Sequence, residues 1–214
     1  MQKMIVLLCA VVLGAIAQAK SVENAKLSID KNNIKVWTYQ NEQNPVFLYK
    51  AETTYHAPIE NAVSLILDVE QAVQWVPYMG SIKVLFRDDQ KGDFTLYMVL
   101  DFPFPLKDRD LVVQGKMIKA ANGQIIIKNK AIQSTYPLNP NYVRLTDYQG
   151  DWTFQKLAKN KVKVSTSGYA NPEGSIPLTF VNMFVQQQPY QMLQKMKDQL
   201  NTQQNFLPLP AALQ

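Results

Sequence analysis

The chain has 214 residues, of which 47% are hydrophobic, with a formal net charge of +5 and one cysteine, Cys9. Its lysines are scattered without a block of like charge, which argues against nucleic-acid binding. The mild positive excess either aids docking on anionic lipid or serves only solubility, and we favour the second interpretation. The length predicts one domain with a sizeable core.

The first twenty residues have the layout of a cleavable signal peptide. Lys3 precedes an apolar run over residues 4–17, and the small-residue site Ala17-Gln18-Ala19 follows it. The alternative, a membrane anchor, needs about twenty apolar residues, and this run is shorter. We therefore predict residues 1–19 as a signal peptide. Cleavage would remove Cys9, so the mature chain would depend on its core alone for stability.

The next segment predicts two strands and then a helix. Residues 33–39 and 46–56 are rich in β-branched and aromatic side chains, and an Asn-Pro pair between them predicts a turn. Pro58 suits a first helical turn, and the apolar residues after it recur at spacings of three and four. We expect a helix from Pro58 to about Val69, followed by an irregular continuation.

A long series of strands follows without an intervening helix, which predicts an antiparallel meander. Along the first of the longer strands one face is strongly apolar, and it comprises Phe94, Leu96, Met98 and Leu100. The predicted strands cover residues 81–86, 94–102, 110–118, 124–133, 142–155 and 162–169.

The C-terminal part predicts a long amphipathic helix over residues 177–200. Gly174-Ser175-Ile176-Pro177 supplies a turn and a helix start, and Pro189 predicts a kink. Residues 201–214 predict an irregular tail, with Phe206 and Leu207 as candidates for docking. The order of elements favours an α+β fold in which a curved antiparallel sheet wraps around the last helix.

The segment from Asp101 to Val113 carries a more specific signal, because a proline-rich apolar link precedes Arg109-Asp110-Leu111-Val112. This pattern resembles the centre of START (StAR-related lipid-transfer) domains, which belong to the helix-grip, or Bet v 1-like, superfamily. The resemblance covers residues 20–200. Supporting matches are Trp75 with Pro77, Ile82-Lys83-Val84-Leu85, and Gly174-Ser175-Ile176-Pro177 ahead of Asn182.

The resemblance implies a helix-grip fold with a curved antiparallel sheet around a long C-terminal helix, and a tunnel sized for a lipid-like molecule. It implies a protein that binds a lipid or other hydrophobic small molecule and carries it between membranes. Together with the signal peptide, it indicates an exported bacterial member in the periplasm, acting as a monomer in transient contact with membranes. The chain departs from the sterol-binding animal members, whose second cavity arginine falls on Gly115 and whose carboxylate falls near Met98.

Nine residues are candidates for contact with the ligand. Arg109 has two interpretations, a contact with a ligand head group or a structural pair with Asp108, Asp110 or another carboxylate at a strand start, and we favour the pair. The apolar residues of the proline-rich link, Phe102, Phe104 and Leu106, either dip into a membrane or pack against the C-terminal helix. The candidate ligand-binding residues are Phe94, Leu96, Met98, Leu100, Arg109, Met117, Phe180, Met183 and Phe184.

We expect no enzyme, metal site or cofactor, because His56 is the only histidine and no glycine-rich phosphate loop is present. The alternative is a cyclase or aromatase of the same superfamily that uses Asp93, Asp101 and Asp110. A third hypothesis is a protein-interaction module that uses the Pro-Leu-Pro tail.

Overall fold

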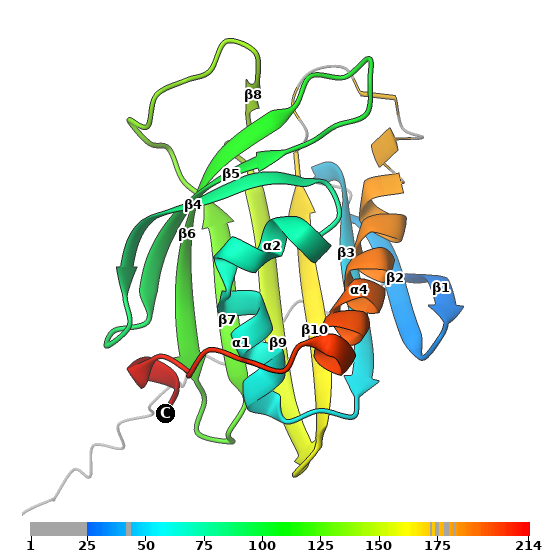
Figure 1. Cartoon of the computed structure of the whole chain (residues 1–214). Coiled ribbons are helices and arrows are strands. Elements are labelled where there is room, and N and C mark those ends of the chain that lie inside the picture. The colour runs from blue at the N-terminus through cyan, green and yellow to red at the C-terminus, as the bar shows by residue number, and fades with distance from the viewer. Residues whose placement is uncertain (1–24, 42–43, 172, 174–175, 178–179, 182) are drawn as a thin grey trace, which may run out of the picture.

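The computed structural model describes residues 25–41, 44–171, 173, 176–177, 180–181 and 183–214. Within these residues ten strands form one strongly curved sheet, and the helices lie against its concave face (Figure 1). In sheet order the strands are β1 (Lys26–Lys31), β2 (Ile34–Asn41), β3 (Asn44–Tyr55), β10 (Lys161–Ala170), β9 (Tyr148–Ala158), β7 (Ile125–Ala131), β6 (Arg109–Lys119), β5 (Asp93–Leu100) and β4 (Met79–Asp88), with β8 (Val143–Arg144) beside β6.

All the strand pairs are antiparallel except β8 with β6, which is parallel. The α+β prediction of a curved antiparallel sheet around a C-terminal helix is confirmed. Strand β1 was not predicted, because it lies at the sheet edge with mostly exposed side chains and three charged residues among its six. The single strand predicted over residues 142–155 is divided into β8 and β9, because the chain turns inward between them and buries Leu145.

The predicted first helix is two helices, α1 (Ile59–Leu67) and α2 (Val69–Trp75). Asp68 between them has non-helical backbone angles, and its carboxylate accepts a hydrogen bond from the backbone N–H of Gln71. A side chain that caps the next helix in this way favours a new start over continuation. Trp75, the last residue of α2, is buried with 2% of its surface exposed.

The C-terminal helical segment is already α-helical at Phe180 and Val181, passes through a π-helical turn, η1 (Met183–Gln187), and continues as α4 (Gln188–Thr202). Pro189 lies in the first turn of α4, directly after this π turn, and the kink expected at Pro189 stays a prediction. A proline has no N–H for the helical ladder, and a change from π- to α-helical hydrogen bonding is a place where that loss is accommodated. Gly174, Ser175 and Asn182, which carried part of the predicted helix start, lie outside the described residues.

Helix α4 packs across the concave face, where Leu193 and Met196 are fully buried and the Tyr55 hydroxyl donates to the Leu193 carbonyl at 2.6 Å. The tail then crosses in front of α1 to the β4–β5 hairpin (Figure 1). Phe206 packs on the core as expected, but the expectation for Leu207 was wrong, because it is exposed. The anchor is Leu213, which is buried in a short 3-10 helix, η2 (Ala211–Leu213).

Candidate functional site

A cavity of about 250 Å³ lies between the concave face of the sheet and the helices. Its wall is formed by apolar side chains from both the sheet and the helices, among them Leu67 of α1, Trp75 of α2, Trp152 of β9 and Met192 of α4. Such a space between a curved sheet and covering helices suits an apolar small molecule, because most of the ligand's surface can be removed from water.

Six of the nine sequence-derived candidates line this cavity: Phe94, Leu96, Met98, Leu100, Met117 and Phe184. The four from β5 alternate along the strand, so the predicted apolar face of β5 is a wall of the cavity. Phe180, Met183 and Arg109 are not among the lining residues. From the last helical segment Val181, Val185 and Gln188 face the cavity instead. Ligand contact by any of these residues stays a prediction.

The guanidinium of Arg109 contacts groups of the protein itself. It is 4% exposed, and its guanidinium lies 4.4 Å from the centre of the Phe102 ring. It donates to the carbonyl oxygens of Lys107 and Glu173. Burial lowers the pKa of Arg109, and nearby Asp108 partly offsets this effect. Arg109 thus holds the β5–β6 link in place.

A row of residues crosses the sheet at the middle of the cavity wall. Gly115 lies opposite Asn129, Gly150 lies opposite Gly168, and Gly168 lies opposite Tyr49. Asn129 joins the two halves, since its side-chain amide donates to the Gly150 carbonyl at 2.7 Å. Three of the five positions therefore carry no side chain.

The glycines of this row leave space that neighbouring rings fill. A Cβ added at Gly115 would lie 2.0 Å from the Phe94 ring, and one added at Gly150 would lie 2.3 Å from the Tyr148 hydroxyl. The rings of Phe94 and Tyr148 thus lie across the glycine positions, against the sheet. Because these rings lie against the backbone, the space above them stays open for a ligand.

Polar groups at this row were not predicted from the sequence. Tyr148, Asn129 and Tyr49 line the cavity from the sheet, and Gln188 lines it from the start of α4. Burial is the main cause that raises the pKa of both Tyr49 and Tyr148, so their hydroxyls remain protonated donors at neutral pH. No local motif marks these residues, because they meet only through strand register.

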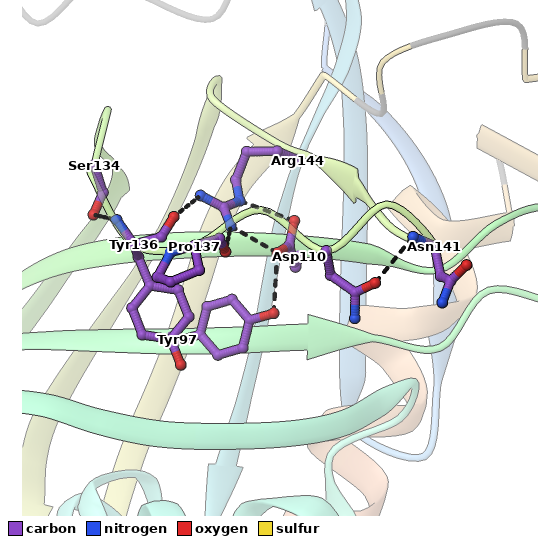
Figure 2. Close-up of polar contacts among 8 residues, drawn as sticks. Tyr97, Asp110, Ser134, Tyr136, Pro137, Asn141 and Arg144 are labelled. Atoms are coloured by element: carbon purple, nitrogen blue, oxygen red, sulfur yellow. Dashed lines mark hydrogen bonds and ion pairs between the residues drawn. The ribbon is translucent and has the colours of Figure 1, made fainter.

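A second polar cluster lies on the opposite, convex face (Figure 2). Asp110 and the cavity-lining Val113 are an odd number of positions apart on β6, so their side chains point to opposite faces of the sheet and that of Asp110 points away from the cavity. Its carboxylate accepts two hydrogen bonds from Arg144, at 2.9 and 2.8 Å, and one from the Tyr97 hydroxyl at 3.0 Å. The ring of Tyr136 stacks on that of Tyr97 at 4.3 Å.

This cluster ties the loop between β7 and β9 to the outside of the sheet. Arg144 also donates to the carbonyl oxygens of Tyr136 and Pro137 within that loop. The next residue, Leu145, lines the cavity and packs with Leu111. The ion pair with Asp110 therefore fixes the register of a cavity-wall residue.

The two aromatic residues of the proline-rich link, Phe102 and Phe104, have different surroundings. Phe102 stacks on Phe184 at 4.4 Å, as packing against the C-terminal segment requires. Phe104 is 94% exposed at the tip of the link. Phe184 also meets Tyr78 edge to face at 4.9 Å, so one ring joins the link, the turn between α2 and β4, and the last helical segment at the cavity wall.

The three carboxylates of the enzymatic alternative have separate partners. Asp93 pairs with Lys116 at 2.8 Å, Asp110 pairs with Arg144, and the Asp101 carboxylate lies against Gly80. Over the described part of the chain there is no group of three or more histidine, cysteine or acidic residues that could hold a metal. In that same part, no helix is long and apolar enough to cross a bilayer.

Comparison with known proteins agrees with this geometry. An uncharacterized protein of Pseudomonas aeruginosa is 26% identical over 190 residues, which is 89% of this chain and 93% of that protein. The phosphatidylcholine transfer protein of Bos taurus is 23% identical over 162 residues, 73% of this chain and 75% of that protein.

Solved structures show the same arrangement. A fragment of a STAR-related lipid transfer protein from Xanthomonas axonopodis is 26% identical with a TM-score of 0.75, covering 83% of this chain and 99% of that one. An aromatase/cyclase from Streptomyces sp. R1128 has the fold alone in common, with a TM-score of 0.54 at 11% identity over 72% of this chain and 93% of that one. The family model of the START domain matches residues 16–205. The chain therefore belongs to the START domain family.

Proposed function

We propose that this protein binds a lipid or other hydrophobic small molecule in the cavity and carries it between membranes. The observation that carries the proposal is the apolar wall between β5 and the C-terminal helical segment, with Phe94, Leu96 and Met98 on one side and Phe184 on the other. Burial of apolar surface supplies about 25 cal/mol per Å² before the costs of binding. The relatives described by name as lipid transfer proteins support the same function.

We propose further that release proceeds by opening at the π turn η1. Phe184 closes the cavity there through its ring contacts with Phe102 and Tyr78 rather than through a continuous α-helix. Movement of this segment would expose the ligand without unfolding the sheet. Hydrogen exchange should show faster exchange for η1 and the start of α4 than for β9 and β10. Equal protection of the two regions would contradict gating at this position.

The predicted setting is the periplasm, reached through cleavage after Ala19. A monomeric carrier in that compartment would meet both membranes in turn, and the exposed Phe104 is our candidate for transient membrane contact. Fractionation of the native cells with N-terminal sequencing of the protein tests this setting. Recovery in the cytoplasm with Met1 intact would contradict it.

The direct test is mass spectrometry of organic extracts from the protein purified out of its native compartment. We expect a stoichiometric hydrophobic molecule, and we expect Met98→Trp to lose it because the larger ring fills the cavity. Thr95→Trp is the matched control, since Thr95 alternates with the lining residues of the same strand and points to the convex face. Extracts without a ligand, or equal ligand in both variants, would overturn the proposal.

We propose no catalytic step. Asp93, Asp101 and Asp110 have separate surroundings in the fold, which supports a carrier over the cyclase-type alternative. The ligand should therefore be recovered chemically unchanged after incubation with the protein. Turnover that disappears in Asp101→Asn would establish the enzymatic alternative instead.

A further inference from the structure

The cavity wall is almost without charge. Among its described lining residues, Arg87 is the one that is ionised at neutral pH. Its guanidinium donates to the Asp89 carboxylate at 2.5 Å and to the Leu67 carbonyl at 3.5 Å, so its charge is already paired within the protein. No acidic residue lies among the described lining residues. A cationic ligand group inside this cavity would thus meet no counter-charge from them, and an anionic one would meet only Arg87, whose charge is already paired with Asp89.

Neutral hydrogen-bonding capacity, in contrast, is present. The Tyr148 hydroxyl lies on the inner face over Gly150, and within the described chain no protein group is hydrogen-bonded to it. Asn129 uses its amide N–H on the Gly150 carbonyl, which leaves its side-chain oxygen without a donor among the described residues. The Trp75 ring also lines the cavity, and its buried Nε1 has no acceptor among those residues. Buried polar groups in proteins normally have partners, so these groups point to a ligand.

We propose, on the basis of the carrier function above, that the ligand is a compact uncharged lipid whose hydroxyl or carbonyl group is held by Tyr148 and Asn129. Burial of an unpaired ionised group costs several kcal/mol, whereas a neutral oxygen that gains hydrogen bonds costs little. The cavity volume of about 250 Å³ is at the small end for ligand sites, which favours one chain or a small ring system. Lipids whose buried end is ionised are rejected.

The raised pKa of Tyr148 agrees with this assignment. Burial is its largest cause, followed by the nearby Tyr49 and Asp151. The phenol therefore remains protonated at neutral pH and can donate to a ligand oxygen. The glycine row places that donor: with no side chain at Gly150, the Tyr148 ring lies against the sheet and presents its hydroxyl at the cavity surface.

The test uses three probes that have the same chain and differ only in the polar end: hexadecanol, hexadecyl phosphate and hexadecyltrimethylammonium. Binding to the delipidated full-length protein is measured by displacement of a fluorescent fatty alcohol at neutral pH. We expect hexadecanol to bind at least about a hundredfold more tightly than either ion, because the described lining residues offer neither ion an unpaired counter-charge.

Phosphate or ammonium binding as tight as that of the alcohol would overturn this inference and leave the carrier function standing. Failure of all three probes, together with ligand-free extracts of the native protein, would overturn both.

The variant Tyr148→Phe removes the hydroxyl and keeps the ring. We expect hexadecanol binding to weaken about tenfold, since the ligand oxygen loses a buried donor. Binding of hexadecane, which has no oxygen, should stay as in the wild type, and this measurement excludes misfolding as the cause. Tyr136→Phe, a matched change on the convex face, should alter neither probe. An equal loss for hexadecane and hexadecanol would contradict the role of the hydroxyl.

Discussion

The Asp110–Arg144 pair gives the sharpest prediction from this structure (Figure 2). The Asp110 side chain is 1% exposed and the Arg144 side chain 14%, so both charges are largely removed from water. Asp110→Asn keeps the shape but removes the counter-charge and replaces one of the two oxygens that accept from Arg144 by an amide NH2. Breaking a buried pair costs about 3–5 kcal/mol, and the residual exposure of Arg144 places this site near the lower value.

We therefore expect Asp110→Asn to lower the free energy of unfolding by about 3 kcal/mol. For a chain of this size, that corresponds to a fall in Tm of roughly 6–12 °C. Urea denaturation and calorimetry measure both quantities. The replacement of both partners, Asp110→Leu with Arg144→Met, should recover part of the loss, because no charge is then left unpaired.

A double-mutant cycle between Asp110→Asn and Arg144→Met separates the pair from other effects. The coupling energy should be about 1–3 kcal/mol if the two side chains interact as Figure 2 shows. A change below about 0.5 kcal/mol for Asp110→Asn, or strict additivity in the cycle, would refute the reasoning. Ligand retention should also fall in Asp110→Asn, because the register of Leu145 in the cavity wall depends on the pair.

Three other measurements follow from the structure. The pKa of Tyr97 is raised to about 12, and that of Tyr148 is raised as well, mainly by burial. The folded chain therefore keeps these protons, whereas tyrosines of the unfolded chain ionise near pH 10. The free energy of unfolding should fall as the pH rises from 10 to 12, and it should fall less steeply in Tyr148→Phe. An unchanged slope in that variant would count against this assignment. Gly168→Ala would place a Cβ 2.2 Å from the backbone oxygen of Gln149. Because a backbone atom cannot rotate away, we expect the free energy of unfolding, measured by urea denaturation, to fall by at least about 2 kcal/mol. A near-neutral result would show that the sheet relaxes there. Phe104→Ser should slow ligand transfer between vesicles without changing the amount of ligand bound, whereas an unchanged transfer rate would remove Phe104 from the membrane contact.

Much of the cavity wall was predictable because it depends on local patterns. The period-2 alternation of Phe94, Leu96, Met98 and Leu100 identifies one face of a strand, and that face lines the cavity. The helical spacing before and after Pro189 identifies a C-terminal helix that must cover a sheet. What a few consecutive residues decide, such as the face of a strand, the amphipathic side of a helix or the order of layers, can be read from the chain itself.

The predictions that differed from the structure depended on partners distant in sequence. The favoured structural pair of Arg109 with a carboxylate stays a prediction, and the structure shows that Asp110 pairs with Arg144 and that Arg109 stacks on Phe102. The sequence carries no local sign of the Asp110–Arg144 pair, because it follows from the parallel pairing of β8 with β6. Phe180 and Met183 follow the α-helical spacing but do not line the cavity, and over Met183–Gln187 the helix is π-helical, so that spacing no longer identifies the inward face there.

The amino-acid sequence by itself determined that the chain forms an α+β domain with an apolar β5 face and a covering C-terminal helix, since those features follow from periodicity. Only the tertiary structure decided where the polar groups of the cavity lie. Asn129, Tyr49 and the three glycines of the row come from five different strands, and strand register brings them side by side, with Tyr148 lying over Gly150. Register is a property of the whole sheet, because a shift by one residue would turn each of these side chains to the other face.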